Sequence, residues 1–205
     1  MVNLYTSFYQ DKDAERQKEL LYCLNKNIEN PLIDNIFLIV EGEVKLPKSD
    51  KLVIVNANRP TYRNFFDLVN DTVTSVNDIS IIANTDIYFN ETLSKIEIYE
   101  RQCIALSRWD KKKDGLRLHN ERFSQDSWIF KGKIRNVRFC DFYLGIPGCD
   151  NRIAYELNRA GYRMFNPATK IQSVHYHQTN LHNYNEQTPK VPKPYLYINI
   201  IGKFF

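Results

Sequence analysis

The chain has few cysteines and no paired cysteine motif. Only four cysteines occur among 205 residues, and no two of them are spaced as Cys-x-x-Cys. Cysteine pairs at that spacing hold structural zinc, and small secreted domains carry many disulfides because their cores are small. The cysteine pattern therefore argues against both classes, and we expect reduced thiols in a cytoplasmic protein.

Long apolar runs are also absent. No run approaches the roughly 18 residues that cross a bilayer as a helix, so we expect no membrane span. The first residues, Met-Val-Asn-Leu-Tyr, are typical of a strand and lack the basic and apolar regions of a secretory signal. Both absences favour a cytoplasmic location.

The chain has no strong charge imbalance. Its 28 Lys and Arg residues against 24 Asp and Glu residues give a net charge of +4. Nucleic-acid-binding domains usually carry a larger, continuous basic stripe, whereas the basic residues here concentrate in 108–117 and 131–138, and basic and aromatic residues do not alternate along one stripe. We expect no nucleic-acid partner. The mild excess fits a phosphate-bearing small ligand or an anionic surface, and solvated faces explain it equally well.

Apolar segments typical of strands alternate with amphipathic segments typical of helices. The expected strands are residues 2–9, 36–40, 52–55, 79–83, 102–106, 127–130, 163–165 and 171–176. Four helices are expected. The first begins near Asp11 or Asp13, the second has Pro60 in its first turn, the third covers residues 91–99 and the fourth begins at Asp150. This alternation predicts an α/β fold with a mostly parallel central sheet flanked by helices. The charged stretch 107–123 is expected to be a long loop.

The chain length fits one main domain with an extension. Residues 1–178 are expected to form a single domain with a substantial core. Residues 179–205 are rich in Asn and Pro, and we expect a wrapping tail or a linker toward a following domain. The ending Gly-Lys-Phe-Phe indicates a piece of a longer protein.

The run Ile79–Ala83 ends abruptly in the polar cluster Asn84-Thr85-Asp86. A short continuous apolar run is typical of a strand buried on both faces, and ligands bind at the carboxyl ends of such strands. A carboxylate placed there can hold a hard divalent cation against a diphosphate. The alternative interpretation is a strand followed by an ordinary Asx turn.

Three further segments carry polar groups that could share that edge of the sheet. Asp126 precedes a strand, Asp150 follows Gly145-Ile146-Pro147-Gly148, and His175 and His177 lie on one face of a strand. Each has an ordinary alternative. Asp126 fits a turn, Asp150 fits a helix cap, and two histidines without a function are plausible.

The order of these segments resembles the nucleotide-sugar glycosyltransferases of the GT-A type. The resemblance rests on Asn84-Thr85-Asp86, Ala105–Trp109, Ser124–Trp128, Gly145–Asn151 and His175-Tyr176-His177. Within that family, the chain is similar to small domains of multidomain proteins from bacteria and large algal viruses. The resemblance implies a single GT-A-like, Rossmann-like domain and a location in the host cytoplasm if the source is viral.

The activity that the resemblance implies is metal-dependent transfer of a hexosyl or deoxyhexosyl group. The donor would be a UDP-sugar, the acceptor a glycan hydroxyl, the cation Mn²⁺ or Mg²⁺, and the outcome inverting. Thr6, Ser7 and Phe8 would hold the base and ribose, and Arg59 and Arg63 the base or phosphates.

The metal and catalytic residues also follow from the resemblance. Asn84 departs from the family's Asp-x-Asp motif, so Asp86 would ligate the cation with help from His175 or His177. Asp150 would deprotonate the acceptor hydroxyl, and Asp126 would bind donor-sugar hydroxyls or be the base itself.

Two other functions compete with this hypothesis. A nucleotidyltransferase shares the sheet and the cation chemistry, but it would normally carry a basic Gly-rich loop after the first strand, which residues 7–13 lack. A carbohydrate- or nucleotide-binding module with little catalytic activity is the second alternative, because Asn84 removes one expected carboxylate. Trp109, Trp128 and Tyr143 could stack on sugars, and core packing explains them as well.

Overall fold

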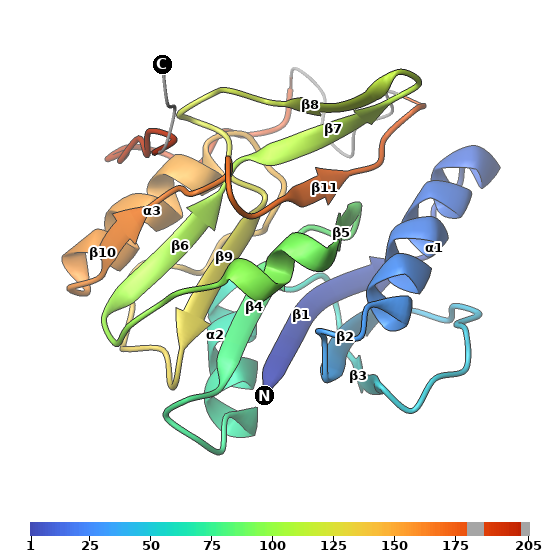
Figure 1. Ribbon diagram of the computed structural model, residues 1–205, viewed down its shortest axis with the longest axis horizontal. Coiled ribbons are helices and arrows are strands. Elements are labelled where there is room, and N and C mark those ends of the chain that lie inside the picture. The colour runs from blue at the N-terminus through green and yellow to red at the C-terminus, as the bar shows by residue number, and fades with distance from the viewer. Residues whose placement is uncertain (180–186, 202–205) are drawn as a thin grey trace.

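A mixed sheet of seven strands forms the centre of the computed structural model, which describes residues 1–179 and 187–201. β9 is antiparallel to both of its neighbours, and the other pairs are parallel. The predicted α/β fold with a mostly parallel sheet is therefore confirmed (Figure 1). The spatial order is β10 (Arg163–Phe165), β6 (Gln102–Leu106), β9 (Ser127–Lys131), β4 (Ile79–Ala83), β1 (Val2–Tyr9), β2 (Asn35–Glu41) and β3 (Leu52–Asn56).

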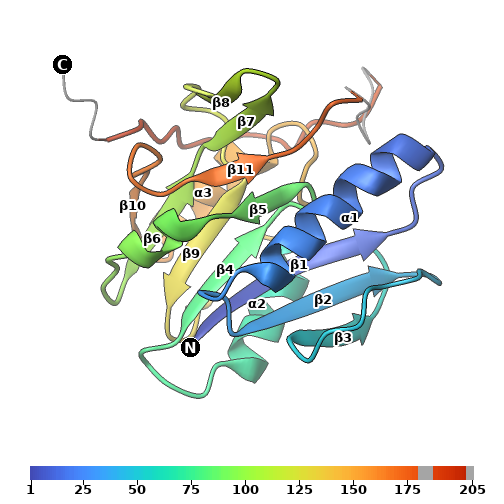
Figure 2. The same ribbon diagram turned by 45° about the vertical axis from the view of Figure 1, so that its right-hand side comes forward.

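Helices cover both faces of this sheet. Figure 2 shows α1 (Ala14–Glu29) on the near face, with α2 (Tyr62–Thr72) and α3 (Cys149–Arg159) on the far face. The apolar side of α1, including Leu20 and Leu24, packs with residues of β1 and β2 in one core cluster, whereas α2 and α3 pack in the other. Each fully buried side chain of this size contributes roughly 1.5–3 kcal/mol, so the two clusters fix both helix layers.

A second sheet of four strands is built from β5 (Ile87–Phe89), β11 (Ser173–His175), β7 (Arg108–Lys112) and β8 (Gly115–Leu118). All four of its strands differ from what the sequence predicted. The stretch 107–123 was expected to be a loop, but it contains the antiparallel hairpin of β7 and β8. β11 pairs with β7 from far along the chain. The expected strand 171–176 is shorter, and β5 was not expected.

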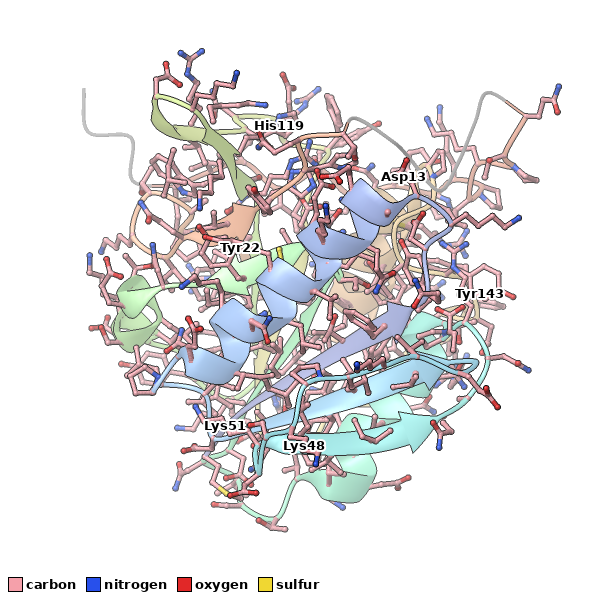
Figure 3. The ribbon with its side chains drawn as sticks, turned by 90° about the vertical axis from the view of Figure 1, so that its right-hand side faces the viewer. Asp13, Tyr22, Lys48, Lys51, His119 and Tyr143 are labelled. Carbon is pink, nitrogen blue, oxygen red and sulfur yellow. The ribbon has the colours of Figure 1, made fainter. Side chains whose placement is uncertain are left out.

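The start of α1 agrees with the prediction. The Asp13 carboxylate accepts a hydrogen bond from the Arg16 backbone N–H at 2.8 Å, as an N-cap does. Figure 3 labels Asp13 at this end of α1. Pro60, however, precedes the N-cap Thr61 of α2 and lies outside the helix. The predicted helix 91–99 is a 3₁₀ turn, η1 (Glu91–Lys95).

Helix α3 begins differently from the prediction that Asp150 caps it. Gly148 holds the N-cap position with φ of 80°, and no side chain caps the helix. Glycine adopts this left-handed conformation without the clash that a Cβ atom would cause. Asp150 therefore lies within the first turn of α3, and its carboxylate does not cap the helix.

Within the described residues, no helix has the length and apolar character of a membrane span. Residues 187–201 run back along the main body, where the Leu196 N–H donates to the Asn151 carbonyl at 2.9 Å. The boundary at residue 178 stays a prediction. The ending 202–205, which indicated a longer protein, lies outside the described residues.

Candidate functional site

A cleft of about 820 Å³ lies where β1 and β4 end. Ser7 comes from the last part of β1, and Asn84, Thr85 and Asp86 follow β4 directly. The parallel pairing of β1 with β4 brings both chain segments to the same edge of the sheet. The Ser7 and Thr85 hydroxyls confirm this proximity, because they form a hydrogen bond of 3.2 Å.

Most of the residues selected from the sequence converge on this cleft. Its lining includes Ser7, Arg59, Asn84, Asp86, Asp126, Asp150, His175 and His177. Thr6, Phe8 and Arg63 are outside that lining. Phe8 is buried in the core on the α1 side, and Thr6 is buried in β1. The Arg63 guanidinium donates to the Val137 carbonyl at 2.6 Å and is 3.6 Å from the Asp141 carboxylate.

Asp86 is the centre of a buried charge cluster. Its Oδ2 atom accepts from Arg16 Nη2 at 2.5 Å and lies 3.2 Å from His175 Nε2. His177 Nδ1 is 3.9 Å from the same oxygen. Arg16 also donates to the Glu19 carboxylate at 2.9 Å, which fixes the guanidinium on α1.

The neighbours of Asp86 decide which groups in the cluster are charged. Burial alone would raise the pKa of Asp86, but the charges of His175 and Arg16 outweigh it and hold that pKa well below its usual range. Burial would lower the pKa of His175, but Asp86 and Asp110 carboxylates on its two ring nitrogens raise it to about 9. Burial and the charge of Arg16 lower the pKa of His177 to about 4.

Asp86, His175 and His177 have the composition of a divalent cation site. One ligand atom from each lies within 4.8 Å of the others. One carboxylate oxygen with two imidazole nitrogens suits Mn²⁺ better than Mg²⁺, which prefers an all-oxygen shell. The chemistry of these three residues is therefore compatible with Mn²⁺, one of the two cations expected from the sequence, and the presence of a cation stays a prediction. Because ligand imidazoles must be neutral, binding would require His175 to release its proton.

Asp126 is oriented by residues from two neighbouring strand ends. The Asn84 side-chain amide donates to Asp126 Oδ1 at 2.9 Å, and Arg108 Nη1 is 3.5 Å from Asp126 Oδ2. Arg108 also donates to Asp110 Oδ1 at 2.9 Å. Arg108 thus connects Asp126 with Asp110, the carboxylate that contacts His175.

Asp150 faces the cleft from the first turn of α3. The Cys149 thiol donates to Asp150 Oδ1 at 3.2 Å. Burial raises the pKa of Asp150 to about 8, and the negative charge of Asp126 adds to that rise. The helix N-terminus, which favours an ionised carboxylate, does not overcome these effects. A carboxyl group with a pKa near 8 can accept a proton from a substrate hydroxyl at mildly basic pH.

Several residues of the site could not be selected from the sequence. Arg16 and Arg108 form its principal ion pairs, and Asp110 holds His175 from the side opposite Asp86. The local sequence does not identify these residues as part of a site, because their partners Asp86, Asp126 and His175 are distant in the sequence and come close only in the folded chain. Among the stacking candidates, Trp128 is buried in the core. The Trp109 indole donates to the Ala168 carbonyl at 2.7 Å.

Comparisons with known proteins add little to this geometry. No family model and no curated protein matches the chain. Among solved structures, it is similar to the 2-C-methyl-D-erythritol 4-phosphate cytidylyltransferase (IspD) of Francisella tularensis. That similarity has a TM-score of 0.39 and 16% sequence identity, and it covers 63% of this chain and 72% of that one. A similarity this weak assigns no function.

Proposed function

We propose that the protein is a metal-dependent glycosyltransferase that moves a hexosyl or deoxyhexosyl group from a UDP-sugar to a glycan hydroxyl with inversion. The observation that carries the proposal is one cleft holding both a candidate cation site and Asp150, a carboxyl group with a pKa of about 8. The first fits a diphosphate, and the second fits a hydroxyl that must lose a proton.

The residues that line the cleft would bind three parts of the donor complex: the cation, the nucleotide and the sugar. Asp86, His175 and His177 would hold Mn²⁺, which would neutralise the departing diphosphate. Ser7 and Arg59 would contact the nucleotide, and Asp126 would accept hydrogen bonds from the donor sugar.

Asp150 would take the acceptor hydroxyl's proton. The acceptor oxygen forms a bond to the anomeric carbon of the donor while that carbon's bond to the phosphate oxygen breaks, so UDP leaves. An ionised Asp150 carboxylate facing the cleft supplies the proton acceptor that this displacement needs.

A nucleotidyltransferase is the second candidate, because such an enzyme also uses a cation, bound to the phosphates of a nucleoside triphosphate. A phosphate nucleophile is already mostly ionised at neutral pH, since its second pKa is about 6, so that reaction needs no general base. With a phosphate acceptor, Asp150 would not be needed as a base. The raised pKa of Asp150 therefore favours a hydroxyl acceptor over a phosphate acceptor.

Thermal unfolding with UDP, with and without manganese, provides the first test. We expect UDP with manganese to raise the melting temperature and UDP with EDTA to raise it less. Release of UDP from a panel of UDP-sugars should then be measurable in the wild type. Asp150→Asn should bind UDP with manganese as the wild type does and lose sugar transfer.

The same experiments can contradict the proposal. Pyrophosphate release from a nucleoside triphosphate, without UDP release from any UDP-sugar, would establish the nucleotidyltransferase instead. No response to any nucleotide would favour a module that only binds carbohydrate.

A further inference from the structure

The segment 187–201 adds an aromatic edge to the cleft. Tyr195 and Tyr197 line the cleft together with Phe123, which precedes β9. Phe123 is 50% exposed and Tyr197 is 45% exposed. Large aromatic side chains that remain accessible beside a cleft are typical of a binding surface. We call Phe123, Tyr195 and Tyr197 the aromatic rim, and the proposed donor contacts leave it unassigned.

Asn151 holds the aromatic rim at a fixed place next to Asp150. Its side-chain amide donates to the Phe123 carbonyl at 3.2 Å, and its own carbonyl accepts from the Leu196 N–H at 2.9 Å. The backbone of Phe123 and that of Leu196, which lies between Tyr195 and Tyr197, are therefore both bonded to the residue that follows Asp150. These contacts therefore connect the aromatic rim directly to the residue next to the proposed base.

A glycine allows the segment to lie this close to α3. A Cβ atom at Gly148 would be 2.7 Å from Tyr195 Oη and 3.1 Å from the Val191 carbonyl oxygen. The Val191 N–H also donates to the Pro147 carbonyl at 2.9 Å. The loop before α3 thus accommodates the segment through both backbone bonding and the missing side chain.

The chemistry of the rim matches a sugar ring. We propose that a glycan acceptor stacks one ring on Tyr197 and Phe123, which places a hydroxyl of that ring next to Asp150. A pyranose has an apolar face of C–H groups, which aromatic rings cover, and a hydroxyl edge, which polar groups bind.

Two further observations support this placement. The Arg122 guanidinium lies 5.1 Å from the centre of the Tyr197 ring, a contact that holds the ring in orientation. Asn151 lines the cleft and is 7% exposed, and its Oδ1 has no hydrogen-bond partner among the described residues. A sugar hydroxyl would supply the donor that this buried oxygen lacks.

This inference rests on the proposed glycosyl transfer and can be tested separately from it. Saturation-transfer NMR would use the methyl glycosides of glucose, galactose, mannose, fucose and rhamnose, each with the full chain, UDP and manganese. We expect saturation transfer to the ring protons of at least one glycoside. Tyr197→Ala and Phe123→Ala should each weaken that binding by about threefold to tenfold, the range typical of one aromatic contact.

The matched control is Tyr99→Ala, which removes a tyrosine that is 70% exposed and is not part of the cleft lining. It should bind the glycoside as the wild type does, and Tyr197→Phe should keep the stacking contact. Affinity for UDP with manganese should stay unchanged in all four variants. Normal UDP binding without saturation transfer to any glycoside, or unweakened transfer in Tyr197→Ala, would overturn the acceptor assignment. Loss of UDP binding in the wild type would instead overturn the glycosyltransferase proposal.

Discussion

Replacing His175 with glutamine tests whether this imidazole is held in its charged form between two carboxylates. Its Nε2 lies 3.2 Å from Asp86 and its Nδ1 lies 3.0 Å from Asp110. The pKa of His175 rises from 6.5 to about 9 because these carboxylates outweigh the effect of burial. Each pKa unit corresponds to about 1.4 kcal/mol, so the charged imidazole should stabilise the fold by about 3 kcal/mol.

The direction of the pH effect on stability depends on whether the folded or the unfolded chain releases the His175 proton first. Below pH 6.5 the folded and unfolded chains both hold the His175 proton, so the stabilisation is fully present. Between pH 6.5 and about 9 the unfolded chain releases that proton while the folded chain keeps it. The advantage of the wild type over His175→Gln should therefore decline across this range and vanish above it.

Urea denaturation at intervals from pH 6 to pH 10, in EDTA, measures this difference in unfolding free energy. Subtracting the variant curve from the wild-type curve removes contributions from other titrating groups, including Asp150. His177→Gln is the matched control, because burial lowers the pKa of His177 to about 4 and its effect should be constant above pH 7. A wild-type advantage that stays constant from pH 6.5 to pH 9, or a His175 ring that titrates near pH 6.5 by NMR, would refute the charged bridge.

Three other changes probe the same cleft. Asp86→Asn should abolish manganese-dependent UDP binding in calorimetry. It should also lower the unfolding free energy by about 3–5 kcal/mol, because the buried cations Arg16 and His175 lose their counter-charge. Tight, manganese-dependent UDP binding by this variant would contradict the cation site. The transfer rate should increase as pH rises through about 8, where Asp150 ionises, and a flat profile from pH 6 to pH 9 would exclude Asp150 as the base. Gly148→Ala should lower the unfolding free energy by about 1–3 kcal/mol, because the backbone has φ of 80° and the new methyl meets Tyr195; an unchanged urea midpoint would contradict that close contact.

The inner strands of the central sheet were predictable because most of their residues are buried. β4 and β6 are short apolar runs, and both appear at the residues expected from the sequence. The β7–β8 hairpin was missed because its residues are charged and partly exposed, as loop residues are. β7 and β8 pair with each other, and β7 also pairs with β11, about 65 residues later along the chain. Local composition does not identify so distant a strand partner.

The convergence of the site was predictable from the order of strand ends, but its charge pairing was not. Asp86, Asp126 and Asp150 could be selected because each lies beside a strand end or a helix start. Arg16 lies inside an ordinary amphipathic helix, and only the packing of α1 on the sheet brings its guanidinium to Asp86. The charge state of a buried carboxylate depends on such partners. The sequence therefore identifies the candidate carboxylate but does not predict whether it is charged.

Asn84 shows why the departure from an Asp-x-Asp motif fits this particular cleft. Ala83 pairs with Ser127 across the antiparallel strands β4 and β9, so the next residues, Asn84 and Asp126, also face each other. An aspartate at position 84 would oppose Asp126 with a like charge, in a cleft that also buries Asp150. The amide of Asn84 donates a hydrogen bond to Asp126 instead. A cation site built from Asp86 with two histidines does not need a second carboxylate at position 84, so the asparagine is compatible with both the proposed metal and the proposed base.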